Sequence, residues 1–501
     1  MRLPLLSGSR VGILNLPDDT VVLRPRRPAE PIADVGAATR DALRYPLSGP
    51  PLEELVAPNG RVTIVVEPPA LPVPGAMADP RRDALAATID ELERIGVASE
   101  RQTILVAGGL SRRAGNRELE ALLPPVPRRA FHGSVVVHDA ESPDLVAIAA
   151  GGRTPLRVNR ALVETDAVVV VSAAETVLHG GAAALVRAAA APVVRAAGAY
   201  SLLETAASRG WKLALALEKA LAAQVPLIGA SLVLDQPRLG GAFRGYPWDD
   251  AALRHLERSP LRRLSALPAA VRHRYLDGVA RDVGVAAAFA GAPSVAHAEA
   301  LLRGVARRAV RLDEPLDALV VGLPWMHHHH PRERLNPITV AAAGLGLALR
   351  LWRDAFPLRD DGTVILLHRL TRHFAPSAHP YRTLFGQLRE GLQPDELPDA
   401  ERAAAEDAGA IAAYRGGRAC HPLQAYADWD SCRPALDRAG SVVVAGCRDH
   451  AAARTLGFVP THGFAPALEM AHGRAGGHAR IGVLLGPPYF PIEVGVRAPP
   501  R

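Results

Sequence analysis

The chain has 501 residues, of which 49% are apolar and 22% are charged, a balance typical of a globular protein long enough for two or three hydrophobic cores. The net charge is +7, but the arginines are scattered and no aromatic residues are interleaved with them, which argues against nucleic-acid binding. We expect neither a signal peptide nor a membrane span, because the apolar N-terminal segment is short and interrupted. The three cysteines lack CxxC spacing, which indicates reduced thiols in a cytoplasmic protein.

Strands and helices are predicted to alternate along the first half of the chain. An edge hairpin that joins Val11–Leu14 to Thr20–Leu23 comes first. Short runs rich in β-branched residues predict buried strands of a parallel sheet, at Arg61–Glu67, Gln102–Ala107, Ser134–Val137, Ala167–Val171 and Val225–Leu234. Helical spacing of apolar residues predicts helices at Ile32–Leu43, at Asp83–Ile95 and within 192–226.

The second half repeats this alternation after a loop-like stretch at 240–260 and two helices, Leu261–Val283 and Val295–Val310. Its predicted strands are Leu316–Gly322, Gly362–Leu367, Ser441–Ala445 and Ile481–Leu485, with a helical region at 375–435 and an irregular tail. We therefore predict an α/β fold of two domains with largely parallel sheets: residues 1–265, a helical linker at 266–315, and residues 316–501. Ligands of open α/β sheets bind outside the carboxyl ends of the strands, so the loop Ser172–Gly181 is the first place to expect a site.

Several short motifs in the first half resemble the N-terminal domain of the nickel-pincer lactate racemase family. They are His138-Asp139, Asp144-Leu145, Thr154-Pro155, Val158-Asn159-Arg160 and Thr165-Asp166. In the second half, residues 336–352 (NPITVAAAGLGLALRLW) are similar to the second domain of the same family. The resemblance covers most of the chain, best at 50–190 and 316–370. It implies two α/β domains with an active-site cleft between them, and a racemase or epimerase of a small 2-hydroxy acid.

The catalytic positions of that family are mostly replaced here. The family has an Asp and an Arg on the loop after the first main strand, where this chain has Pro68 and Leu71, and Glu67 is the nearest carboxylate left to substitute for them. Ser111 stands where the family has its first catalytic His. His179 lies within two residues of the expected second base. The resemblance therefore gives His179, Ser111 and Glu67 as the catalytic candidates.

The resemblance also implies a nickel-pincer nucleotide that is attached to a lysine and bound through a His ligand of the nickel. One alignment of the loop puts Arg187 at the lysine position and another puts Ala183 there, so neither supplies a lysine. No His occurs between His179 and His255 to serve as the nickel ligand. Residues left to bind the cofactor are Arg187, Arg112 and Asn336, and the alternative is that the protein holds no cofactor.

A run of four histidines, His327–His330, follows the first strand of the second half. Alternate residues of an extended backbone share a side, so His327 and His329 could bind one metal ion together. An exposed polar loop explains the same run without a metal, since no carboxylate or Cys spacing accompanies it. His368 is a further candidate, because it comes directly after the predicted strand Gly362–Leu367.

Three functional hypotheses remain open. The first is the racemase or epimerase that the family resemblance implies. The second is a cofactor-free pseudoenzyme that binds a small carboxylate, or a protein partner, with arginines in the loops as carboxylate ligands. The third is a different metal-dependent enzyme that uses His179, His368 and the four-histidine run. Under each hypothesis we expect no nucleic-acid partner and no membrane.

Overall fold

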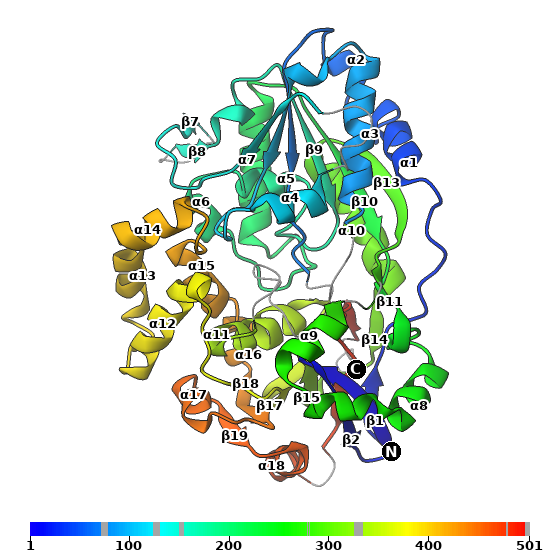
Figure 1. Cartoon of the computed structure of the whole chain (residues 1–501), viewed down its shortest axis with the longest axis vertical. Coiled ribbons are helices and arrows are strands. Elements are labelled where there is room, and N and C mark those ends of the chain that lie inside the picture. The colour runs from blue at the N-terminus through cyan, green and yellow to red at the C-terminus, as the bar shows by residue number, and fades with distance from the viewer. Residues whose placement is uncertain are drawn as a thin grey trace, which may run out of the picture.

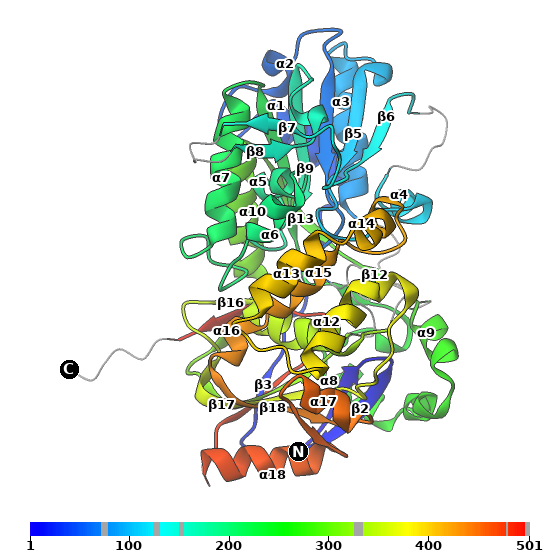
Figure 2. The same ribbon diagram turned by 90° about the vertical axis from the view of Figure 1, so that its left-hand side faces the viewer.

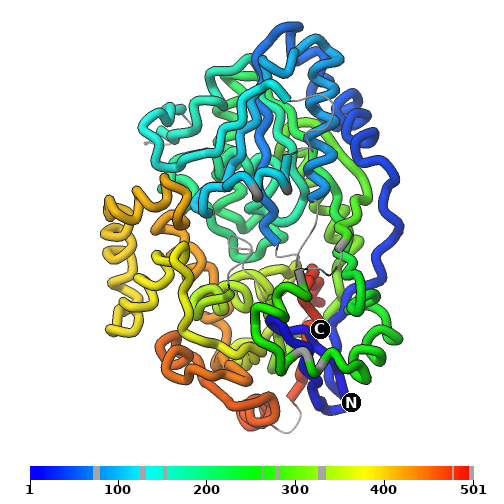
Figure 3. The backbone as a smooth tube through the Cα atoms, viewed as in Figure 1, coloured from blue at the N-terminus to red at the C-terminus, as the bar shows by residue number. Residues whose placement is uncertain are grey.

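Two six-stranded sheets flanked by helices organise the computed structural model of this chain, and the backbone passes between them several times (Figures 1 and 3). The structure describes residues 1–71, 79–123, 131–149, 155–277, 279, 281–324, 334–476 and 479–495. The α/β fold with largely parallel sheets that the sequence predicts is confirmed. None of the described helices combines the length and the apolar composition needed to cross a bilayer.

The first sheet has five parallel strands and one antiparallel edge strand. Its order is β13 (Val285–Gly291), β10 (Leu227–Leu234), β9 (Ala167–Ala173), β4 (Val62–Val66), β5 (Gln102–Val106) and β6 (Ser134–Val137), with β13 antiparallel to β10. β9 is buried along its whole length, as its run of four valines predicts. Val66 of β4 lies opposite Val171 of β9 and Val106 of β5, so the residues that follow these three strands meet at one edge.

Helices cover both faces of the first sheet. α1 (Val35–Arg44), α2 (Leu52–Leu55) and α3 (Arg81–Arg94) pack on one face. α5 (Ala182–Val186), α7 (Arg209–Ala222) and α10 (Pro293–Arg308) pack on the other. The remaining elements here are α4 (Asn116–Leu122), α6 (Ala191–Ala196) and the small hairpin of β7 (Val146–Ile148) and β8 (Leu156–Val158).

The second sheet is parallel throughout. Its order is β19 (Val459–Thr461), β18 (Ala439–Ala445), β17 (Leu358–Leu367), β15 (Leu316–Gly322), β20 (Ile481–Leu484) and β3 (Val21–Leu23). One face packs against the hairpin of β1 (Arg2–Ser7) and β2 (Arg10–Asn15) and against α8 (Asp250–Arg258), α9 (Ala269–Asp277) and α18 (Phe464–Ala475).

The opposite face of the second sheet carries another group of helices, of which α15 (Pro422–Asp430) lies toward the first sheet (Figure 2). They are α11 (Pro337–Ala341), which continues as a π-helix at Ala342–Leu347 and a 3-10 turn at Ala348–Arg350, then α12 (His379–Arg389), α15, α16 (Arg433–Leu436) and α17 (His450–Thr455). α13 (Leu397–Ala405) and α14 (Ala408–Arg415) pack outside α15. Small pairings complete the described structure: β11 (Arg238–Leu239) with β12 (Arg281–Asp282), and β14 (Val310–Leu312) with β21 (Ile492–Val494) and β16 (Trp352–Arg353).

Four local predictions are wrong, and in the first of them a pairing partner distant in sequence decides the structure. Val11–Leu14 pairs with β1 through a tight turn at Gly8, whose φ of +53° favours glycine, whereas Thr20–Leu23 contributes β3 beside β20. The predicted helix Leu261–Val283 is divided into a 3-10 segment at Pro260–Ala266, α9 and β12, with Pro268 at the break. The stretch at 240–260 contains α8, and the predicted tail contains β21.

The division of the chain into two domains and a linker, at residues 265 and 315, stays a prediction. Two strands pair with a sheet on the other side of these boundaries. β3, near the N-terminus, belongs to the second sheet, and β13, inside the expected linker, belongs to the first. One hydrophobic core joins both halves, since Val177, Leu202 and Trp211 cluster with Leu319 and Leu366 of the second sheet. We infer that the space between the two sheets is a fixed part of the fold.

The pH dependence of stability follows from His138, one of the residues that carry the resemblance. His138 is buried after β6, its Nε2 lies 2.9 Å from the Ala189 carbonyl oxygen, and Asn159 donates a hydrogen bond of 3.1 Å to its Nδ1. Burial lowers the pKa of His138 to about 4, against about 6.5 in an unfolded chain. The unfolded chain therefore binds the proton first as the pH falls below about 6.5, and stability is lost in that range.

Lowering the pH from 7 to 5 should cost about 2 kcal/mol of unfolding free energy through His138 alone. Urea denaturation at both pH values measures this loss in the natural chain and in a His138→Gln variant, which retains hydrogen-bonding groups but does not titrate. The variant should lose about 2 kcal/mol less than the natural chain over this interval. Equal losses in the two proteins would contradict the assignment.

Candidate functional site

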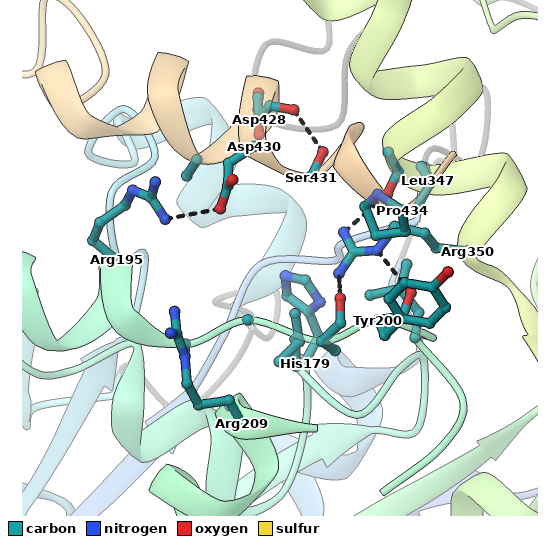
Figure 4. Close-up of a pocket in the computed structure, with 18 of the residues that line it drawn as sticks. His179, Arg195, Tyr200, Arg209, Leu347, Arg350, Asp428, Asp430, Ser431 and Pro434 are labelled. Atoms are coloured by element: carbon teal, nitrogen blue, oxygen red, sulfur yellow. Dashed lines mark hydrogen bonds and ion pairs between the residues drawn. The ribbon is translucent and has the colours of Figure 1, made fainter. Parts of the chain in front are cut away.

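A cavity of about 470 Å³ lies between the two halves of the molecule (Figure 4). Its first side is formed by the loop after β9, by α5 and by the segment from α6 to the start of α7. Its second side is formed by the π-helix after α11 and by α15 and α16. Five arginines line it, Arg187, Arg195, Arg209, Arg350 and Arg433, together with three aspartates, Asp428, Asp430 and Asp437. Arginines outnumber carboxylates in this lining, which suits a small anionic ligand.

His179, the predicted base, lines this cavity. Its Nδ1 lies 2.9 Å from Thr176 Oγ1 within the same loop, which fixes the orientation of the ring. Burial is the main cause that lowers the pKa of His179 well below 6.5, and the positive charges of Arg187, Arg81 and Arg350 lower it further. The imidazole is therefore neutral at pH 7 and can accept a hydrogen bond from a ligand.

The loop that carries His179 is held by His297, a residue that the sequence analysis missed. Gly180 and Gly181 have φ values of +106° and +52°, and a Cβ on either would collide with His297. His297 Nε2 lies 3.0 Å from the carbonyl oxygen of Thr176, and its ring is fully buried on α10. No local pattern distinguishes His297 in the sequence, because a single His on an amphipathic helix has many structural explanations.

Three other predicted residues form one buried cluster at the wall of the cavity. Arg187 lines the cavity, and its Nε lies 3.5 Å from Oε2 of Glu67, the residue that follows β4. The same guanidinium donates to the Gly108 carbonyl oxygen at 2.8 Å and to Ser111 Oγ at 3.4 Å. Burial raises the pKa of Glu67 to about 7, although Arg187 and Arg81 oppose this change. Glu67, Ser111 and Arg187 are thus brought together, with Arg187 between the other two and the cavity.

Arg350 is one of the cavity residues that the sequence analysis did not single out. Its guanidinium donates to the carbonyl oxygens of Gly346 (3.1 Å), Tyr200 (3.4 Å) and Ala199. No carboxylate among the described residues forms an ion pair with Arg350, whereas Arg195 binds Glu401 at 2.6 Å. Burial lowers the pKa of Arg350 to about 10, so the side chain stays charged at neutral pH. The sequence did contain an indication of this residue, because Arg350 lies in the segment ALRLW that carries the resemblance in the second half.

A buried ion-pair network holds the loop that follows β4. The Arg81 guanidinium lies 2.8 Å from Glu175 and 2.7 Å from Asp79, with Arg81 and Glu175 only 1% and 3% exposed. Glu175 also accepts hydrogen bonds from the backbone N–H groups of Ala70 (2.7 Å) and Leu71 (3.3 Å). The network therefore joins the loop after β9 to the loop after β4.

Arg112 and Asn336, two further predicted positions, do not line the cavity. Arg112 forms an ion pair of 2.6 Å with Glu118 at the start of α4. Asn336 caps α11, with its side chain accepting from the Thr339 N–H at 3.0 Å. His327 and His329 fall outside the described residues. Within the part of the chain that the structure describes, no group of three or more His, Cys, Asp or Glu side chains is placed to hold a metal ion.

Comparisons with known proteins agree with this architecture. Residues 8–182 match the family described as the lactate racemase N-terminal domain. The fold is similar to the lactate racemase apoprotein from Thermoanaerobacterium thermosaccharolyticum, with a TM-score of 0.59 and 16% identity over 97% of this chain and 98% of that one. It is also similar to a protein from Thermotoga maritima, with a TM-score of 0.51 and 12% identity over 93% of this chain and 100% of that one. No curated protein matches the sequence.

Removal of Glu175 should destabilise the protein strongly, because Arg81 would remain buried and two backbone N–H groups would lose their acceptor. We expect Glu175→Ala to lower the unfolding free energy by about 3–5 kcal/mol. Glu164→Ala is the matched control, since Glu164 forms a solvent-exposed ion pair with Arg160. This substitution should change the unfolding free energy by less than about 1 kcal/mol. Urea denaturation of both variants tests the prediction, and equal small losses would show that the network contributes little.

Proposed function

Residues 8–182 match the family described as the lactate racemase N-terminal domain, and from this match we propose that the chain binds a small 2-hydroxy acid in the cavity between its two halves. The observation that carries the proposal is Arg350, a buried cation at the cavity whose described hydrogen-bond acceptors are all uncharged carbonyl oxygens. A carboxylate in contact with Arg350 would supply the missing negative charge.

His179 and Arg350 suit the two ends of such a ligand. Their side chains approach the cavity from the first and second halves of the molecule, respectively (Figure 4). With the carboxylate against Arg350, the 2-hydroxyl group would lie toward the neutral ring of His179. An imidazole held at Nδ1 by Thr176 has its other nitrogen available for a hydrogen bond to a hydroxyl group.

The residues of this cavity do not fit covalent attachment of the nickel-pincer nucleotide that the family resemblance implies. The chain has two lysines, Lys212 and Lys219, and both lie exposed on α7 without lining the cavity. Arg187, at one aligned lysine position, stays protonated and is committed to Glu67, Gly108 and Ser111. Of the described histidines only His179 lines the cavity. We therefore propose ligand binding that does not depend on this cofactor.

Isomerisation of the same ligand is the second candidate function. The position of His179 at the cavity favours it, whereas the low pKa of the ring opposes it, because such an imidazole is a weak base. A general base at the cavity that removes and returns the C2 proton would exchange this proton with solvent. Deuterium incorporation at C2 of L-lactate in heavy water, followed by NMR, measures this step directly. Exchange that is lost in His179→Asn would favour the enzyme, whereas binding without exchange would favour the non-catalytic protein.

Binding of L-lactate should depend on Arg350. We expect Arg350→Met to weaken binding about 30-fold in calorimetry, which corresponds to the loss of one charge-assisted contact of about 2 kcal/mol. Arg303→Gln, on the exposed side of α10, is the matched control and should bind as the natural chain does. Since Arg350 also holds the backbone at 199–200, circular dichroism verifies folding, and His179→Asn provides a second variant. Unchanged affinity in both cavity variants would overturn the proposal.

A further inference from the structure

A second group of arginines gathers at the carboxyl end of the second sheet, among residues that do not line the inter-domain cavity. The turn between β1 and β2 lies over this end: the Gly8 N–H donates to the Leu323 carbonyl oxygen at 2.7 Å, and Ser7 Oγ donates to the Leu367 carbonyl oxygen. Arg10 begins β2, Arg369 follows β17, and Arg448 follows β18. The carboxyl end of a parallel sheet is where α/β proteins bind their ligands.

Backbone contacts bring these arginines together. His368 N–H donates to the Ala445 carbonyl oxygen at 3.2 Å, so the segments after β17 and β18 run side by side. Arg272, a buried residue of α9, reaches the hairpin turn and donates to Ser9 Oγ at 3.0 Å. Figure 1 shows α9 and the β1–β2 hairpin at the same end of β15. The segments that carry these four arginines therefore meet at one end of the second sheet, and we call Arg10, Arg272, Arg369 and Arg448 the arginine cluster.

The arginine cluster has no carboxylate counter-charge among the described residues. Burial and the charges of Arg369, Arg272 and Arg448 lower the pKa of Arg10 to about 10. Burial and neighbouring arginines likewise lower the pKa values of Arg272 and Arg369, and Arg334 is one of the neighbours of Arg272. The nearby carboxylate of Asp449 lies 3.8 Å from Arg372. Like charges held this close repel one another unless an anion offsets them.

His368 adds an unused hydrogen-bonding group at the same place. Its Nδ1 is buried and has no hydrogen-bond partner in the described structure. The ring lies against the hairpin turn, since a Cβ on Gly8 would be 3.8 Å from His368 Cδ2. A buried nitrogen without a partner costs free energy, and a ligand at this position could satisfy it.

We propose that the arginine cluster and His368 bind a phosphate dianion, either inorganic phosphate or the phosphate group of a small phosphomonoester. Arginine donors arranged in forks match the oxygens of phosphate, and two negative charges offset a four-arginine cluster better than one carboxylate does. The convergence of the four side chains on the end of one sheet fits a small ligand rather than the extended backbone of a nucleic acid. This site is separate from the inter-domain cavity and does not depend on the function proposed for that cavity.

Calorimetric titration of the full chain with inorganic phosphate, at constant ionic strength, tests the proposal. We expect saturable binding of one phosphate per chain, and at least a tenfold loss of affinity in an Arg369→Gln/Arg448→Gln double variant. Arg454→Gln, an exposed arginine of α17, is the matched control and should keep the affinity of the natural chain. Glycerol 3-phosphate that binds more tightly than inorganic phosphate would identify a phosphomonoester as the ligand, and the reverse order would identify free phosphate.

Two further comparisons keep the test decisive. Without phosphate, the double variant should melt at a higher temperature than the natural chain, because two of the repelling charges are removed. Arg350→Met should leave phosphate binding unchanged, and the double variant should leave lactate binding unchanged. Heat that does not saturate, unchanged affinity in the double variant, or loss of phosphate binding in Arg350→Met would each overturn the proposal.

Discussion

The parallel register of β4, β5 and β9 is the constraint on which the site depends. Val66, Val106 and Val171 lie side by side in the first sheet, so the residues that follow them leave the sheet at one edge. Glu67 and the loop from Ser172 to Gly181 are placed together in this way. A slip of one residue in any of these strands would exchange the side chains between two faces that are both packed under helices, so the packing fixes the position of the polar groups at the edge.

The buried arginines around that edge differ in how far neighbouring carboxylates offset their charge. Arg81 has two carboxylates, and Arg187 has Glu67, so both belong to the framework. Arg350 donates its described hydrogen bonds to backbone carbonyls, with Asp430 as a nearby charge, and faces the cavity from the second half of the molecule. A buried cation whose charge is not fully offset by neighbouring negative charge destabilises the folded protein and attracts an anion. This is the physical basis for assigning carboxylate binding to the cavity.

Much of the scaffold could be predicted from the sequence, because it rests on local patterns. The valine run at Ala167–Val171 and the apolar run at Leu316–Gly322 are central strands, as their composition indicates. β3 and β13 could not be assigned in the same way, since their place depends on partners far along the chain. For the site, loop position identified His179, whereas His297 acts by filling the space beside two glycines, and nothing in the local sequence records that contact.

The resemblance to the lactate racemase family separates into a structural part and a chemical part. His138 and Asn159 hydrogen-bond to each other and hold loops of the first half, so their presence preserves the fold. Ser111 and Arg187 occupy positions at which the resemblance implies a catalytic and a cofactor-holding group, Glu67 is adjacent to a third such position, and the three residues form a cluster of their own. The fold and the chemistry of the site can therefore diverge independently.

The most direct test of this account is the intact mass and nickel content of the protein when it is produced together with the enzymes that make the pincer cofactor. The account predicts an unmodified mass and a cavity that binds L-lactate without nickel. Nickel near one atom per chain, with added mass on Lys212, Lys219 or another side chain, would contradict it and would establish the cofactor-dependent racemase in its place.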